Sequence, residues 1–145
     1  MTTRISSVSL IFLLALSIST VSAQTAAKTF SKSFNAQGKG LLRLDLPGAV
    51  DVKTWDSPTI RFEINVSLAS GNTSMLNELA NVGRYNLTAK SLVGEDVMIV
   101  NAPNLLKQVK IKGEILKEFV TYTVYVPKRM GIEMPNALSL AEVKK

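Results

Sequence analysis

The sequence predicts a mainly β protein. We expect stacked short strands, in a β-solenoid-like arrangement or a rolled sheet, with one short helix near residues 74–82. Two observations carry this prediction. Apolar and polar residues alternate over most of residues 41–68, as they do in half-buried strands. Between residues 71 and 83 the apolar spacing changes to that of one face of a helix.

The first 23 residues have the pattern of a signal peptide. Arg4 precedes the apolar run VSLIFLLALSI, and Val21 and Ala23 occupy the two small-residue positions of a cleavage site. The run is too short for a transmembrane helix, which needs roughly 20 apolar residues. We therefore predict a signal peptide over residues 1–23 and a single β-rich domain over residues 24–145, exported and without an integral membrane span.

Composition narrows the compartment further. The 145 residues include no cysteine, so neither a disulfide nor a lipidated N-terminal cysteine can form. This favours a bacterial protein that is periplasmic, outer-membrane-associated or extracellular. The net charge of +6 has two interpretations. It would suit an acidic surface such as lipopolysaccharide, or it reflects the ordinary surface lysines of a soluble domain, which we prefer.

The first strands are predicted within residues 42–68. Inward-facing positions are Leu42, Leu44, Leu46, Val50, Val52, Ile60, Phe62, Ile64, Val66 and Leu68. If Pro47-Gly48-Ala49 closed a hairpin, Asp45 would face Asp51 across it. Like charges directly opposite one another are unfavourable. We therefore expect the chain to turn a corner at residue 48 and to pair with other strands.

The helix is predicted over residues 74–82. Asn72 or Thr73 can cap its start, and Gly83 suits the left-handed position after its end. Its apolar face should carry Met75, Leu79 and Val82. We expect this helix to cover an open end or edge of the sheet.

Strand character returns in residues 84–92, 95–102 and 103–127. The last of these segments places alternate apolar side chains on one face: Val120, Tyr122, Val124 and Val126. Pro127 ends that strand. Residues 132–145 predict one or two further short strands.

The sequence argues against an enzyme. Without histidine or cysteine, it can form no Ser-His-Asp triad, Cys-His pair or zinc finger. Asp45 and Asp51 would make a carboxylate pair, but both should lie on the solvated face of the strands. Asp51, Asp56 and Glu63 do not match a calcium loop. We predict no catalytic, metal or cofactor site.

Nucleic-acid binding is not expected either. Glu114 and Glu118 interrupt the basic run formed by Lys107, Lys110, Lys112 and Lys117. A solvated surface explains this run better than a nucleic-acid site does, because such a site would need more charge and stacking aromatic side chains.

The lone tryptophan, Trp55, is the candidate surface contact. It lies on the Asp51 and Lys53 side of its strand, just before a turn. An exposed tryptophan can serve as a contact hot spot or a carbohydrate platform. The alternative, which we favour, is that it packs on the adjacent turn or on the N-terminal segment.

Several stretches resemble one bacterial envelope family. They are FSKSF, LRLDLPGAVDVKTWDSPTIRFEINVSL and TYTVYVPKRMGIEM, within Phe30 to Met134. The chain is similar there to the adhesins with β-strand repeats, also called auto-transporter-adhesin-like or head-GIN proteins. The resemblance implies an exported stack of short strands without an enzymatic site, and it assigns no functional residue. Such proteins continue with several more rungs, whereas here one further rung begins at MPNALSLAEVKK.

Three explanations for the small number of rungs remain open: a short version of the family, a truncated chain that is the N-terminal part of a longer strand-repeat stack, or a partner that covers the open edge by edge-strand association.

The first functional hypothesis is an exported, non-enzymatic, adhesin-like envelope or surface protein that acts through an extended β surface. The alternative is a small periplasmic carrier that binds a lipid or other apolar ligand inside a curved sheet. A carrier needs an empty apolar interior, whereas a solenoid fills its interior with side chains.

Overall fold

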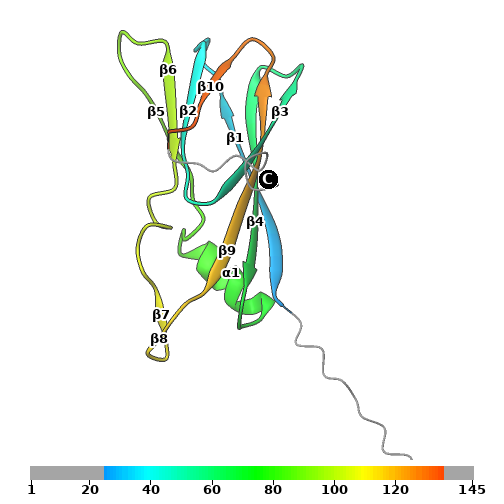
Figure 1. Cartoon of the computed structure of the whole chain (residues 1–145), viewed down its shortest axis with the longest axis vertical. Coiled ribbons are helices and arrows are strands. Elements are labelled where there is room, and N and C mark those ends of the chain that lie inside the picture. The colour runs from blue at the N-terminus through cyan, green and yellow to red at the C-terminus, as the bar shows by residue number, and fades with distance from the viewer. Residues whose placement is uncertain (1–24, 136–145) are drawn as a thin grey trace, which may run out of the picture.

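A computed structural model describes residues 25–135 (Figure 1). The predicted signal peptide and the segment from residue 136 onward lie outside the described residues. No helix of the described part is long and apolar enough to cross a bilayer.

The described chain forms two four-stranded sheets, one helix and a small hairpin. Sheet A contains β1 (Ala27–Asn35), β4 (Thr59–Leu68), β9 (Glu118–Pro127) and β3 (Ala49–Trp55), in that order. Sheet B contains β10 (Gly131–Glu133), β2 (Leu41–Asp45), β6 (Val97–Asn101) and β5 (Thr88–Ser91). The hairpin pairs β7 (Lys110–Ile111) with β8 (Glu114–Ile115). The mainly β prediction is confirmed, with neither four-stranded sheet closed. Solenoid-like stacking stays a prediction.

Both sheets mix parallel and antiparallel pairs. In sheet A, β4 pairs antiparallel with β1 and β9, and β3 pairs parallel with β9. In sheet B, β2 pairs parallel with β10 and β6, and β5 pairs antiparallel with β6 at the edge of the sheet. The chain passes between the two sheets five times: from β1 to β2, β2 to β3, β4 to β5, β6 to β9 and β9 to β10 (Figure 1).

The predicted corner at residue 48 is confirmed. β2 and β3 lie in different sheets, so Asp45 and Asp51 are not hairpin partners. Gly48 makes the corner with φ of +115°, a conformation that residues with side chains rarely adopt. A Cβ atom there would lie 2.3 Å from the carbonyl oxygen of Val120. The corner thus packs directly on the backbone of β9.

The core lies between the sheets and follows the predicted alternation. The inward side chains of β2 and β4 are buried, as are those of the second half of β9. Leu42, Leu44, Phe62, Val100 and Val124 are all 0% exposed. At the edge of sheet A, the ring of Phe34 lies edge-on to that of Phe62, with 5.7 Å between centroids. Period-two patterning therefore located most of the core correctly.

The helix α1 (Thr73–Asn81) begins one residue before the prediction. Asn72 caps it, since its side chain accepts a hydrogen bond from Met75 N, and Gly83 follows with φ of +80°. The predicted apolar face was only partly right. Leu76 and Leu79 are buried, whereas Val82 is 77% exposed, because the helix ends before Val82 can turn toward the core. Figure 1 shows α1 at the lower end of sheet A, as expected for a cover.

Two predicted strand segments are shorter in the structure. β5 contains only Thr88–Ser91, because the chain makes a turn over residues 83–86 instead of continuing as a strand. In that turn Asn86 N donates a hydrogen bond of 3.1 Å to Gly83 O. Tyr85 and Leu87 are nevertheless buried in the core. Residues 103–117 form a loop and the β7–β8 hairpin instead of one long strand. At the hairpin tip Lys112 and Gly113 both have positive φ, as a tight two-residue turn requires.

Candidate functional site

Trp55 lies at the end of β3 and is half-buried. Its indole Nε1 donates a hydrogen bond of 2.8 Å to Thr59 O, across the turn to β4. Its ring lies 5.5 Å from that of Tyr125 on β9, at an angle of 39°. The tryptophan therefore packs on the adjacent turn, as favoured by the sequence, and its role as a contact residue stays a prediction.

Tyr125 lies at the centre of a small cluster on the outer face of sheet A. Arg61 and Lys53 are its direct neighbours on the flanking strands. The Lys53 ammonium lies 5.7 Å from the ring centroid, and the Arg61 guanidinium carbon lies 6.0 Å away. At such distances a cation is attracted to the ring face. Sequence analysis missed Tyr125, because it considered only the inward face of β9.

Each cation also pairs with a carboxylate two residues away on its own strand. Arg61 Nη2 lies 3.1 Å from Glu63 Oε1, and Lys53 Nζ lies 3.8 Å from Asp51 Oδ2. The two pairs flank β9 on opposite sides, next to Thr123 and Tyr125. Exposed pairs of this kind contribute only ~0–1 kcal/mol to stability, so their side chains can form new hydrogen bonds with a ligand at little cost.

Small polar residues continue this face toward β1. The strand register aligns Thr29, Asn65 and Thr121 in one row, and Ser31, Glu63 and Thr123 in the next. Thr29 Oγ1 donates to Asn65 Oδ1 at 2.8 Å. The outer face of sheet A therefore offers hydroxyl and amide groups beside the aromatic pair. We call Trp55, Tyr125, Lys53, Arg61, Asp51 and Glu63 the Tyr125 cluster.

A second, buried cluster lies on the inner side of β9. The side chains of Arg84 and Glu118 are each 9% exposed, and Arg84 Nη2 lies 2.9 Å from Glu118 Oε1. Arg84 Nη1 also donates to the carbonyl oxygens of Asn104 and, at 2.7 Å, Lys107. Arg84 thus ties the segment after α1 to the 104–107 loop and to β9. Because the Arg84 guanidinium bonds to all of these segments, we assign the buried ion pair a structural role.

Two tyrosines border the same carboxylate. Burial, followed by the negative charge of Glu118, raises the pKa of the Tyr85 phenol to about 12. The same two causes raise the pKa of Tyr122 above its ordinary value. The Tyr122 hydroxyl and Glu118 Oε2 are buried without a well-formed hydrogen bond among residues 25–135. From the sequence, Glu118 was placed with the basic run on a solvated surface; this was wrong for Glu118, whose side chain is 9% exposed because it is in phase with Val120 and Tyr122 and points inward.

The other carboxylates considered from the sequence are not brought together. Asp45 is exposed on β2, and Asp51 is half-buried on β3 in the other sheet. Asp51, Asp56 and Glu63 each pair with a separate cation, Asp56 with Lys128 at 2.7 Å. Within residues 25–135 no group of three potential metal ligands is assembled from acidic, histidine or cysteine side chains.

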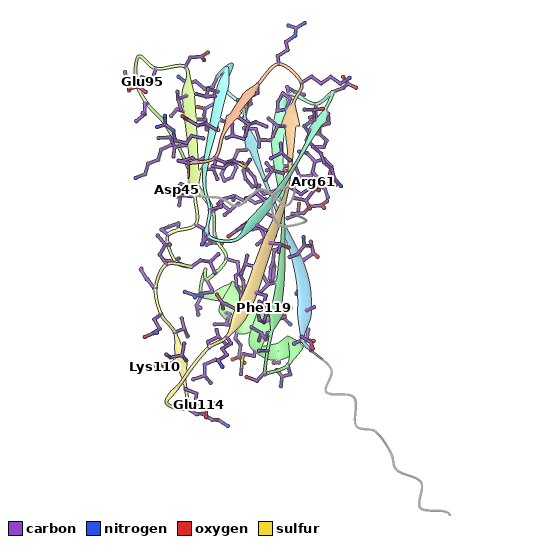
Figure 2. All side chains as sticks on the ribbon, in the orientation of Figure 1. Asp45, Arg61, Glu95, Lys110, Glu114 and Phe119 are labelled. Atoms are coloured by element: carbon purple, nitrogen blue, oxygen red, sulfur yellow. The ribbon has the colours of Figure 1, made fainter. Side chains whose placement is uncertain are left out.

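The basic run lies on the loop and hairpin that project from the lower end of the molecule. Figure 2 labels Lys110 and Glu114 there, far from Arg61 on sheet A. All four lysines of the run are exposed, as predicted for a solvated surface. A hollow of about 350 Å³ lies between this hairpin and the start of α1, bordered by Gly71, Met75 and Leu116. Another, of about 420 Å³, lies beside Arg84, Glu118 and Phe119.

Comparisons with known proteins add little. No family model matches the chain, and no curated protein matches it. One similar solved structure is that of a "putative cell adhesion protein" from Clostridium sporogenes, with 10% sequence identity and a TM-score of 0.39. The match covers 74% of this chain and 45% of the other, so this chain spans less than half of that protein. A likeness this distant carries no argument about function, and the resemblance to the head-GIN family stays a prediction.

Proposed function

We propose that this protein is an exported, non-enzymatic binding protein of the bacterial envelope or cell surface. It acts in an adhesin-like manner through the outer surface of its sheets. The observation that supports this proposal is the filled interior. The side chains between the sheets, such as Leu44, Phe62 and Val124, are 0% exposed and pack against one another.

The filled interior weighs against the carrier alternative. A carrier would bind its ligand inside the curved sheet, and such pockets usually enclose about 300–1,000 Å³. The two hollows described above lie at the surface, beside the hairpin and the 104–107 loop. A partner would therefore contact the outer faces or the edges of the sheets. Polar side chains and the Tyr125 cluster are available there.

Native mass spectrometry tests whether the protein carries a small ligand in its interior. The protein is purified from the envelope fraction of its own host and measured before and after denaturation. We expect the bare mass of residues 24–145, or of a longer chain, with no small molecule attached. An additional mass that leaves on denaturation would support the carrier and contradict the proposal.

Export is tested on the same cells. Cell fractionation, with N-terminal sequencing of the recovered protein, should find the chain in the envelope or medium and starting at Gln24. Digestion of intact cells by an added protease then separates the cell surface from the periplasm. A cytoplasmic protein that retains residues 1–23 would contradict export.

A further inference from the structure

We propose that the Tyr125 cluster binds a neutral saccharide chain, of the kind built from β-linked hexoses. This inference rests on the proposed function, because it names the partner of the outer β surface. Three features carry it: a fixed aromatic pair, a balanced set of charges and rows of small polar groups.

The aromatic pair is held in place before any ligand arrives. The hydrogen bond from Trp55 Nε1 to Thr59 O fixes the indole, and the Tyr125 ring lies against it at 5.5 Å. A sugar ring with equatorial hydroxyl groups presents apolar C–H faces, which stack on aromatic rings. Tryptophan and tyrosine bury a large area at little cost in side-chain entropy. Pre-positioned rings reduce that cost further.

The charges around the rings are balanced. Lys53 and Arg61 lie in the row of Tyr125, and their partners Asp51 and Glu63 lie in the row of Thr123. Each sugar hydroxyl both donates and accepts a hydrogen bond. Two cations supply donors and two carboxylates supply acceptors, so the cluster complements vicinal hydroxyl groups. An acidic polymer would instead require an excess of positive charge, which this cluster lacks.

The face around the cluster suits a chain better than a single sugar. Toward β1 the register continues with the small polar side chains of Thr29, Ser31, Asn65, Thr121 and Thr123. These small residues offer further hydroxyl and amide groups. The apolar part of the cluster is one tryptophan and one tyrosine, which is smaller than the apolar core of a protein interface.

The single tryptophan makes binding directly observable, since Trp55 is the only source of indole fluorescence in the chain. Residues 24–145 are titrated with cellohexaose and mannohexaose as neutral probes and with hexagalacturonate as the acidic probe. We expect a saturable change in fluorescence with at least one neutral probe. Raising the salt concentration from 50 to 500 mM should leave the affinity unchanged, because screening weakens only net charge attraction.

Variants locate the site by calorimetry, which does not depend on the indole. Trp55→Ala and Tyr125→Ala should each weaken binding by about tenfold or more, and Trp55→Phe should retain part of the affinity. Phe119→Ala is the matched control, because Phe119 is 65% exposed on the same strand at the other end of the face (Figure 2). Its affinity should not change. Unfolding midpoints identify any variant that fails to fold, in which case Tyr125→Ser and Trp55→Phe replace it.

Three results would overturn the inference: no binding of either neutral probe, salt-sensitive binding of hexagalacturonate alone, or equal loss of affinity in Phe119→Ala. None of them would affect the proposed function, which depends on export and on the absence of an interior ligand. Conversely, a cytoplasmic location would contradict the proposed function even if the purified protein bound a hexose chain.

Discussion

At the scale of single residues, Glu118 determines how the inner side of β9 is held together. Its carboxylate accepts from Arg84 and lies near two tyrosines whose phenol pKa values are raised. Removing only one partner of this ion pair should lower the stability of the fold, because a buried charge without its partner is strongly destabilising.

Glu118→Gln should therefore lower the free energy of unfolding by roughly 3–5 kcal/mol, since it leaves the Arg84 guanidinium buried without a counter-charge. Urea unfolding monitored by Trp55 fluorescence gives the value. The double variant Arg84→Met/Glu118→Leu should recover most of the loss, because apolar side chains of similar volume replace the pair. If the double variant were as unstable as the single one, the ion pair itself would be the main source of stability.

Tyr85 and Tyr122 make stability sensitive to high pH. Both phenol pKa values are raised in the folded state, that of Tyr85 to about 12, against about 10 in the unfolded chain. Their contribution is complete below pH 10 and is lost as the pH rises toward the folded pKa. The free energy of unfolding should fall between pH 10 and 12.

Tyr122→Phe provides the comparison for this pH dependence. It removes a buried hydroxyl without a well-formed hydrogen bond, so at pH 7 the variant should be at least as stable as the parent protein. It should also lose less stability between pH 10 and 12. Urea unfolding at a series of pH values measures both. Identical pH profiles for variant and parent would mean that Tyr122 does not contribute to the loss, which would then be assigned to Tyr85.

At the scale of elements, the corner between β2 and β3 is the least tolerant turn. Gly48→Ala places a methyl group against Val120 O and requires a strained backbone. We expect a loss of roughly 3 kcal/mol or more from strain and steric overlap. Gly38→Ala is the control. Gly38 has φ of +70°, but no atom lies within 4 Å of an added Cβ, so only the backbone cost of ~1 kcal/mol applies. Equal losses in the two variants would exclude the contact with β9 as the cause.

The N-terminal cap of α1 should contribute less to stability than the corner at Gly48 does. Asn72 accepts from Met75 N at 2.9 Å, and Asn72→Ala should cost ~1 kcal/mol. The loss should appear in thermal unfolding, while Asn72→Ser should remain close to the parent protein. A loss in Asn72→Ser equal to that in Asn72→Ala would show that the side-chain oxygen is not the important group.

At the scale of the whole molecule, the sequence predicted the strands better than their partners. Alternation identified β2, β3 and β4 and the inward face of β9 because each strand buries one side only. It did not reveal that residues 103–117 leave the sheet, since short apolar runs suit loops and strands alike. Pairing depends on contacts such as Gly131 with Leu41, which are far apart in the chain. The like charges at Asp45 and Asp51 were enough to predict the corner.

The candidate site was only partly predictable for the same reason. Trp55 was identified because it is the single tryptophan, and its packing on the turn was expected. Its neighbour Tyr125 comes from a strand that follows 70 residues later, and only the parallel pairing of β3 with β9 brings the two together. The buried Arg84–Glu118 pair likewise joins segments that carry no shared motif.

The three-way attachment of Arg84 has a practical consequence. Small exported domains often fasten their loops with disulfides, which form only in oxidising surroundings. Here a guanidinium group joins the end of the helix region, the 104–107 loop and β9, and the chain contains no cysteine. Reducing agents leave this attachment intact. The domain should therefore fold equally well in the reducing cytosol of a production host and outside the cell, without an oxidant or a disulfide isomerase.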